Sequence, residues 1–271
     1  MRGTRDFKWD NGDMVWIDLE GAVNVRDVGG LPTVDGGTTL PGRLLRSENL
    51  QDLTPSDVDR LVKEIGVTTV VDLRTTGEVE LEGPGPLDAV ASVHHEHYPV
   101  LKELGNASEA VSEALLVTKI ERDRARYPDN IVTGHYLGYL EERPEEVTGA
   151  LRAIATAEGA AIVHCAAGKD RTGVIVAMAL TAAGVEPEEI VADYMATADR
   201  IEAIIERLRR SNTYAVDMST RPVSAHSPRA ETMRAFLGQL DARYGGLPRW
   251  LADNGFADDE YGLLRDKLRQ P

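Results

Sequence analysis

The chain has 271 residues, of which 42% are hydrophobic and 5% aromatic, and 45 acidic against 30 basic residues give it a net charge of −15. Such an acidic surface argues against binding to nucleic acid or to anionic membranes in general. The single cysteine excludes an internal disulfide framework and favours a reducing compartment. Residues 1–10 lack an apolar signal core and no stretch reaches membrane-spanning length, so the sequence predicts a soluble cytoplasmic protein without stable membrane insertion.

Helices and strands alternate along the first part of the chain. Thr54 and Pro55 are a typical helix start, as N-cap and first helical residue. The expected elements are short strands in 23–45 with a hairpin turn at 35–37, a helix at 54–66, and strands at 67–73 and 89–97. This alternation predicts an α/β fold with a central, mostly parallel sheet flanked by helices on both faces.

The second part of the chain is richer in helices. A short apolar run at 159–164 predicts a buried strand, and helices are expected at 107–122, 131–140, 144–156, 172–183, 187–195, 199–210, 229–244 and 258–268. Residues 211–228 are polar and aperiodic, so 199–228 is a possible helical lid. Residues 1–17 form a polar lead-in, and no linker divides the chain, so we expect one domain over 1–271.

The only cysteine lies in the motif His164-Cys165-x5-Arg171-Thr172-Gly173, between the strand at 159–164 and an apolar helix. Backbone N–H groups of a strand-to-helix loop add to the positive end of the helix dipole and form a cradle for an oxyanion. A thiol in that cradle ionises readily, and a planar guanidinium can grip two oxygens of the same anion. These residue types at this spacing indicate cleavage of phosphate esters through a phosphocysteine.

Two other interpretations of this motif fit its residues less well. A lone cysteine is often a small buried hydrophobic residue, but here a polar, glycine-containing loop follows it. A nucleotide-binding loop would need glycine at position 163 and Ser or Thr at position 170, whereas the chain has Val163 and Asp170.

Residues 161–173 resemble the signature of the cysteine-dependent protein tyrosine phosphatase superfamily. The Gly-Lys-Asp-Arg-Thr-Gly version is similar to the bacterial tyrosine/serine phosphatases of the kind secreted by mycobacteria, some of which also act on phosphoinositides. Weaker matches follow in the expected order and extend the resemblance over residues 18–269: 24–30, 42–47, 71–74 with Glu78, 191–194 and 244–246.

The motif and the resemblance assign roles within the loop. Cys165 is expected to be the nucleophile, and His164 to orient the loop through the backbone. Thr172 is expected to donate its hydroxyl to the cysteine sulfur; the alternative is a cap of the following helix, and the two roles can coexist. The expected phosphate-binding residues are Ala166, Ala167, Gly168, Lys169, Asp170, Arg171 and Thr172.

The general acid is less directly indicated. Close relatives carry an aspartate just after the segment that corresponds to Tyr98-Pro99, but this chain continues with Val100. Asp170 is therefore the expected acid, with Glu103 in reserve; the alternative for Asp170 is a carboxylate that only braces the loop. Lys169 is either a seat for a second phosphate or a solvated lysine.

Other polar clusters are interpreted as structural. Asp72 and Arg74 are expected to form a buried ion pair, and Asn24, Arg26 and Asp27 are assigned to the fold. Residues 94–97 contain three histidines on an expected strand, and the side chains of His94 and His97 would lie on opposite faces of it. No metal site is therefore predicted, and no cofactor is expected.

The sequence thus predicts a metal-independent phosphatase for phosphotyrosine, with phosphoserine, phosphothreonine or phosphoinositide as further substrates. A phosphoinositide-preferring lipid phosphatase, a non-catalytic phosphate-binding module and a rhodanese-like sulfurtransferase are the alternatives. The expected partner is a phosphoprotein or phosphoinositide substrate, not nucleic acid. The sequence indicates no oligomeric state, and relatives can be exported without a recognisable signal peptide.

Overall fold

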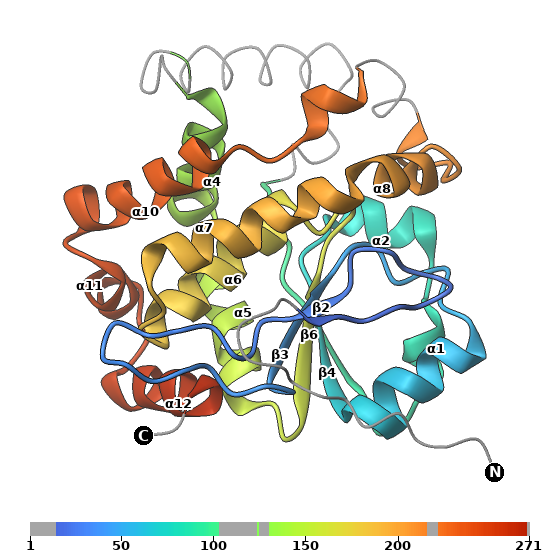
Figure 1. The fold of residues 1–271 in the computed structure, drawn as a ribbon, viewed down its shortest axis with the longest axis horizontal. Helices are drawn as coiled ribbons and strands as arrows, with labels where there is room; N and C mark the ends of the chain where they lie inside the picture. Colours follow the sequence, from blue (N-terminus) through green and yellow to red (C-terminus); the bar gives the residue numbers. More distant parts are fainter. Residues whose placement is uncertain (1–14, 103–123, 125–129, 216–221, 270–271) are drawn as a thin grey trace.

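A computed structural model describes residues 15–102, 124, 130–215 and 222–269 (Figure 1). Its centre is a six-stranded sheet in the order β1-β2-β3-β6-β4-β5. The strands are β1 (Val15–Trp16), β2 (Arg26–Asp27), β3 (Leu44–Ser47), β4 (Val67–Asp72), β5 (His94–His97) and β6 (Ala160–His164). β3, β6, β4 and β5 run parallel, and β1 and β2 add an antiparallel edge, which confirms the expected mostly parallel sheet.

Neighbouring residues of the central strands face two separate cores. Val71 and Val163 belong to the larger core, whereas Val70 and Ile162 belong to the smaller one. Because successive side chains of a strand point to opposite faces, apolar residues at every position require cover on both sides. The consecutive apolar residues of β6 and of the second half of β4 therefore account for the layers of helix on both faces of the sheet.

Helices cover each face (Figure 1). The smaller core is covered by α1 (Pro55–Asp59), the π-helix η1 (Arg60–Ile65) and the 3₁₀ helix η2 (Pro86–Ala89). The larger core is covered by α4 (Ile131–Glu142), α5 (Pro144–Thr156), α6 (Asp170–Ala182), α7 (Pro187–Ala196), α10 (Ala230–Tyr244), α11 (Leu247–Asp253) and α12 (Asp258–Leu268). The remaining elements are α2 (Thr76–Glu82), α8 (Ile201–Leu208) and the 3₁₀ helices η3 (Thr197–Arg200) and η4 (Val223–His226).

Most predicted elements are confirmed, with some differences at their ends. Thr54 caps α1 and exchanges hydrogen bonds with Asp57, as the helix start predicts. The expected strand at 89–97 is wrong in its first half, because η2 ends at Ala89, residues 90–93 form a turn and β5 spans only His94–His97. Helices α2 and α11 were not predicted, and α6 begins at Asp170 rather than at residue 172. The helix expected at 107–122 lies outside the described residues.

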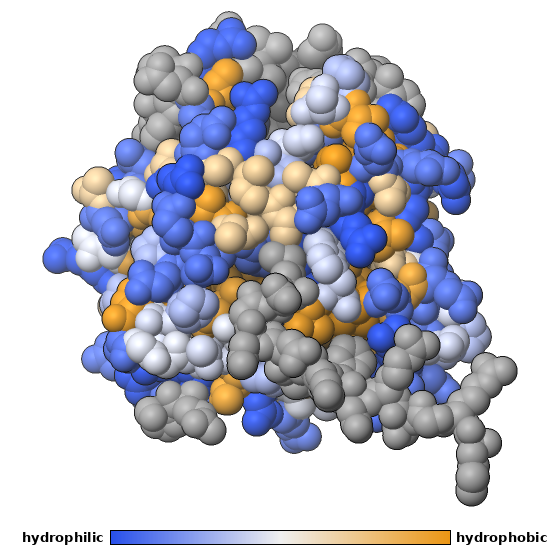
Figure 2. Space-filling model, viewed as in Figure 1, coloured by the Kyte–Doolittle hydropathy of each residue, from blue (hydrophilic) through white to orange (hydrophobic). Residues whose placement is uncertain are grey.

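Hydrophilic residues dominate the face seen in Figure 2, with hydrophobic residues in small groups between them. Large hydrophobic side chains that are exposed, such as Leu81 and Val34, lie on separate elements. In the described part of the chain no helix is both long and apolar enough to cross a membrane.

Candidate active site

Cys165 follows the last residue of β6, and the loop after it leads directly into α6. We call residues 165–171 the Cys165 loop. β6 lies between β3 and β4, all three parallel, so the loop sits where their carboxyl ends meet. This edge is where open α/β sheets bind ligands. Cys165 itself is only 2% exposed.

Three successive carbonyl groups of the Cys165 loop are turned away from its centre. The carbonyl of Ala166 accepts a hydrogen bond from the backbone N–H of Asn49 (3.0 Å), and that of Ala167 accepts one from the Asn24 side-chain amide (3.1 Å). The carbonyl of Gly168 accepts one from Nη2 of Arg46 (2.7 Å). In a trans peptide the N–H points opposite to the C=O. The N–H groups that follow these carbonyls are therefore directed inward, as a cradle for an anion requires.

Gly168 is the position where this loop depends on glycine. Its φ of +66° lies in the left-handed region, which side chains disfavour. A Cβ there would also lie 2.5 Å from the carbonyl oxygen of Ser47. The loop thus passes too close to the end of β3 for any side chain at this position.

A buried ionic network holds the outer side of the loop in place. Asp193 on α7 accepts Nε of Arg26 at 2.9 Å and also pairs with Nη1 of Arg46. Nη1 of Arg26 donates to the side-chain oxygen of Asn24 (2.6 Å), which orients that amide towards the loop. Burial opposes ionisation of Asp193, but the two guanidinium groups outweigh it and hold the pKa of Asp193 below its usual range. The sequence assigns Asn24 and Arg26 to the fold, and in the structure they hold the Cys165 loop in position.

Arg171 is held by a carboxylate on α2. Both of its terminal nitrogens donate to Glu78, one of them at 2.9 Å. Burial opposes the charge of Arg171. The hydrogen bonds to Glu78, together with the electrostatic effect of the nearby Cys165 side chain, outweigh burial and raise the pKa of Arg171 above its ordinary value. In the sequence, Glu78 is indicated only by a weak family motif, residues 71–74 with Glu78. The Thr75-x-x-Glu78 capping pattern of α2 is the local signal for its helix.

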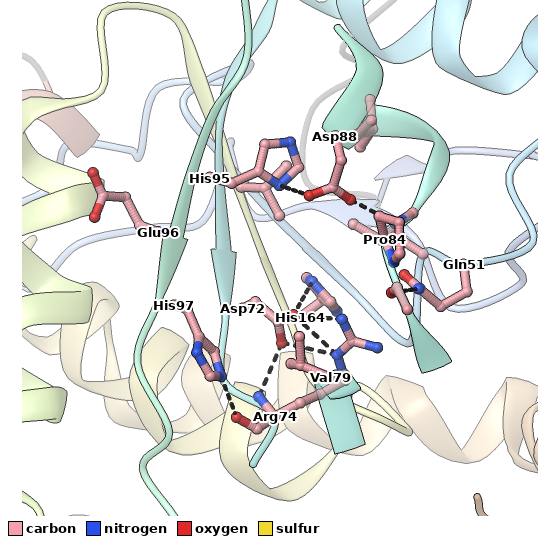
Figure 3. A pocket seen from close by; sticks show the side chains of 15 residues that line it. Gln51, Asp72, Arg74, Val79, Pro84, Asp88, His95, Glu96, His97 and His164 are labelled. Carbon is pink, nitrogen blue, oxygen red and sulfur yellow. Dashed lines mark hydrogen bonds and ion pairs between the residues drawn. The ribbon is translucent and has the colours of Figure 1, made fainter. Parts of the chain in front are cut away.

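The His164 side of the loop borders a cavity of about 140 Å³ at the edge of β4 and β5 (Figure 3). Nε2 of His164 lies 3.6 Å from a carboxylate oxygen of Asp72, and Asp72 pairs with Arg74 as predicted. Burial lowers the pKa of His164 to about 4, although Asp72 opposes the shift. A neutral His164 at pH 7 fits the expected orienting role better than proton transfer. Its Nδ1 lies 3.4 Å from the carbonyl oxygen of Cys165.

Thr172 does not cap α6. The helix begins at Asp170 with Lys169 in the N-cap position, so Thr172 belongs to the first turn and the capping alternative is wrong. Its hydroxyl oxygen is fully buried and has no hydrogen-bond partner among the described residues.

Lys169 and Asp170 lie at the rim of the loop. Nζ of Lys169 donates to the backbone carbonyl of His226 in η4 (2.6 Å), and the side chain is 14% exposed, so the solvated alternative for Lys169 is wrong. The Asp170 side chain is 36% exposed and accepts a hydrogen bond from the hydroxyl of Tyr136 at 2.6 Å. Both residues, with Arg171, line a groove of about 790 Å³ between α4 and the start of α10.

Residues of the expected lid pack on the loop. Ile201, Ile204 and Tyr214 form a buried apolar cluster with Ala166, and Ala167 packs against its side. Residues 216–221 of this segment lie outside the described residues, as does Glu103, the reserve candidate for the general acid.

The His-rich strand β5 does not assemble a cluster of ligands. Nε2 of His97 lies 2.8 Å from the carbonyl oxygen of Arg74, and Nδ1 of His95 lies 3.5 Å from Asp88. Among the residues that the structure describes, no group of three or more His, Cys, Asp or Glu side chains is placed to hold a metal ion.

The chain matches one family model and is similar to several known proteins. A family model described as the tyrosine phosphatase family matches residues 17–270. The triple specificity protein phosphatase PtpB of Mycobacterium tuberculosis is 29% identical over 278 residues, covering 93% of this chain and 98% of its own. A tyrosine-protein phosphatase of Nostoc commune is 29% identical over 241 residues, which cover 86% of this chain and 76% of that protein. A crystal structure of P. aeruginosa TpbA in complex with pTyr is 16% identical with a TM-score of 0.35, covering 86% of this chain and 98% of that one.

Proposed function

Because the chain belongs to the tyrosine phosphatase family, which confirms the resemblance of its sequence, we propose that it hydrolyses phosphate monoesters without a metal, through a phosphocysteine on Cys165. The observation that carries this proposal is the set of three outward carbonyls at residues 166–168, which leaves inward N–H groups around the thiol. Phosphotyrosine is the proposed main substrate, with phosphoserine and phosphothreonine as further substrates.

The first step is an in-line displacement. The Cys165 thiolate attacks phosphorus, so that a P–S bond forms while the P–O bond to the leaving alcohol breaks. Inward N–H groups of the loop and the guanidinium of Arg171 stabilise the charge on the three equatorial oxygens. Glu78 supports this role because it fixes the plane of the Arg171 guanidinium.

The leaving oxygen takes a proton, which we assign to Asp170. Water then attacks the phosphocysteine, the P–S bond breaks, and inorganic phosphate and the thiolate are released, with Asp170 taking back a proton from the water. The buried hydroxyl of Thr172, which has no partner among the described residues, is available to donate to the departing sulfur. Glu103 remains the reserve candidate for the acid.

The test of the reaction is Cys165→Ser. This variant should still bind phosphate esters but lose turnover by a factor on the order of 10³ or more, because a hydroxyl in the same cradle is a far weaker nucleophile than a thiolate. Initial rates with p-nitrophenyl phosphate and a phosphotyrosine peptide, with and without EDTA, measure this. Substantial turnover in Cys165→Ser would refute the phosphocysteine, and activity lost to EDTA would refute metal independence. Turnover of thiosulfate instead of phosphate esters would favour the sulfurtransferase alternative.

We further propose that phosphoinositides are substrates. The support is local: in a chain of net charge −15, Lys169 and Arg171 both line the 790 Å³ groove beside the loop. Lys169 could leave the carbonyl of His226 for a second phosphate group. Lys169→Ala should then weaken phosphoinositide hydrolysis at least about tenfold more than phosphotyrosine peptide hydrolysis. Equal losses on both substrates would refute this role.

A lid is the last element of the proposal. The packing of α8 and Tyr214 on Ala166 supports a covering role for residues 199–215 and 222–228. Amide hydrogen exchange in these residues should slow when vanadate occupies the loop. Unchanged exchange would argue against a lid. As for location, we propose the cytoplasm, where a catalytic thiol stays reduced, or export without a signal peptide.

A further inference from the structure

A row of hydroxyl groups that the proposed reaction does not use ends at Asp170. The hydroxyl of Tyr136, on α4, lies 2.6 Å from Oδ1 of Asp170. On its other side the same hydroxyl lies 2.8 Å from the hydroxyl of Tyr194, on α7. Three elements distant in the sequence, α4, α6 and α7, thus contribute to one chain of hydrogen bonds.

The direction of this chain follows from its Asp170 end. A carboxylate can only accept, so the single hydroxyl hydrogen of Tyr136 goes to Asp170. The Tyr136 oxygen must then accept a hydrogen bond from the hydroxyl of Tyr194. Burial and the negative charge of Asp170 raise the pKa of Tyr136 well above its ordinary value, so its hydroxyl keeps its hydrogen. Every donor in the chain therefore points towards Asp170.

The tyrosine rings hold this arrangement rigidly. Tyr136 is fully buried, and its ring contacts those of Tyr194, Phe236 and Tyr139 at centroid distances of 6.4, 6.0 and 6.1 Å. The Tyr194 ring lies over Gly173 in the first turn of α6, where a Cβ would come within 3.0 Å of it. The hydroxyl of Tyr136 consequently has one position available, and that position faces Oδ1 of Asp170.

We infer that Tyr136 is a positioning residue that assigns different roles to the two oxygens of Asp170. Oδ1 is occupied as an acceptor, so Oδ2 is left to carry the proton. Oδ2 lies towards Lys169, 3.5 Å from its Nζ, at the rim of the groove. This inference rests on the proposed function in so far as Asp170 is the acid; the hydrogen bond from Tyr136 does not depend on that role.

Other charged or titratable groups also face this carboxyl. Those that line the same groove are Lys169, Arg171, His135, His226, Arg229 and Glu231. Tyr139 and Tyr194 also interact with the charge of Asp170. Tyr136 and Lys169 make polar contacts with its two oxygens. Removal of the Tyr136 hydroxyl should therefore change the titration of this carboxyl without moving the neighbouring cations.

The test compares Tyr136→Phe and Tyr194→Phe with the wild-type enzyme. Tyr244→Phe is the matched control, since its hydroxyl also meets a carboxylate, that of Glu141 at 3.4 Å, but on the exposed surface. Carbon-13 NMR of the Asp170 carboxyl, assigned with Asp170→Asn, follows the titration directly. In parallel, pH–rate profiles are recorded with a phosphotyrosine peptide and with p-nitrophenyl phosphate.

In Tyr136→Phe the carboxyl titration and the basic limb of the profile should both move up by about one pH unit, because a donor to the ionised form is lost. The turnover of the phosphotyrosine peptide should fall about tenfold, as expected for one hydrogen bond to a charged group, and that of p-nitrophenyl phosphate much less. Tyr194→Phe should show smaller shifts of the carboxyl titration and of the pH–rate profile and a smaller loss of turnover. Tyr244→Phe should change none of these.

An unmoved carboxyl titration in Tyr136→Phe would overturn the inference. So would a rate loss from Tyr136→Phe that is as large in the Asp170→Asn background as in the wild type, because the effect would then not pass through Asp170. If Asp170→Asn slows both substrates equally, the proposed acid is wrong, and the NMR titration alone decides whether Tyr136 holds the carboxyl.

Discussion

The two sides of the Cys165 loop are built differently. On the outer side, the almost completely buried side chains of Asn24 and Arg46 donate to the loop carbonyls. The equally buried carboxylate of Asp193 pairs with Arg46. At the rim, Lys169 and Asp170 are 14% and 36% exposed and each contacts a neighbouring element through one main hydrogen bond. Under the proposed function, the buried side would fix the shape of the cradle for any phosphate group, whereas the rim would adapt to what is attached to that phosphate. Changes on the buried side should therefore affect all substrates, and changes at the rim should affect selectivity.

The largest effect is expected from Asp193→Asn. It leaves Arg26 and Arg46 buried with one carboxylate removed, which should lower the free energy of unfolding by about 3–5 kcal/mol. Urea unfolding measures this, and the folded fraction should lose activity on every substrate. Glu188→Gln is the control, because the pair of Glu188 with Arg234 is exposed and should matter far less. Similar losses in both variants would contradict the contrast between buried and exposed pairs.

His164 should make stability depend on pH. Its pKa is lowered from 6.5 to about 4 in the folded protein, so between these values the unfolded chain binds a proton that the folded one does not. Stability from this group is therefore full above pH 6.5 and is lost as the pH falls towards 4, by at most about 3 kcal/mol. Asp27, whose pKa burial raises to about 7, acts in the opposite direction over much of this window.

The His164 contribution is accordingly measured as a difference. The free energy of unfolding of wild type and His164→Gln is compared from pH 7 to pH 4, which cancels Asp27 and other common groups. The difference in free energy of unfolding between wild type and His164→Gln should become smaller as the pH falls. The control His94→Gln changes the exposed strand β5, and its free energy of unfolding should have the same pH dependence as that of the wild type. A difference that is constant with pH would show that His164 is not kept neutral by the fold.

A smaller loss is expected from Glu78→Gln, which weakens the support of Arg171 but leaves the guanidinium in place. The kcat/KM for both p-nitrophenyl phosphate and a phosphotyrosine peptide should fall about 30-fold, since a misplaced transition-state contact is costly. Glu80→Gln, on an exposed position of the same helix, is the matched control. A loss for one substrate alone would place Glu78 with the rim rather than with the cradle.

The smallest effect is expected at the rim itself. Lys169→Ala should change kcat/KM for p-nitrophenyl phosphate by less than about threefold, because this substrate has no second phosphate and Lys169 makes mainly a contact to the carbonyl of His226. Steady-state kinetics measure it. A loss as large as that in Glu78→Gln would mean that Lys169 belongs to the cradle, and the distinction between the two sides would not hold.

The sequence by itself determined the central strands of the sheet and the position of the loop, and it predicts the chemistry of the loop. The mostly apolar runs of β4 and β6, the capped start of α1 and the His-Cys-x5-Arg-Thr-Gly spacing are local patterns, and the structure has the corresponding elements at these residues. Even so, α6 starts two residues earlier than its apolar run, because Asp170 and Arg171 join the helix as polar first-turn residues that no hydrophobic period reveals.

Only the tertiary structure decided which distant residues serve the loop. Glu78 reaches Arg171 across 93 positions, Asn24 reaches Ala167 across 143, and Arg46 reaches Gly168 across 122. In the sequence Asn24, Arg46 and Glu78 belong to weak motifs that indicate no partner. The partner is decided by the strand order β3-β6-β4, which brings the strand ends together. The sequence does not reveal the role of the tyrosines near Asp170 either. A tyrosine on an apolar helix face is predicted as a core residue, and only the structure shows which acceptor its hydroxyl contacts.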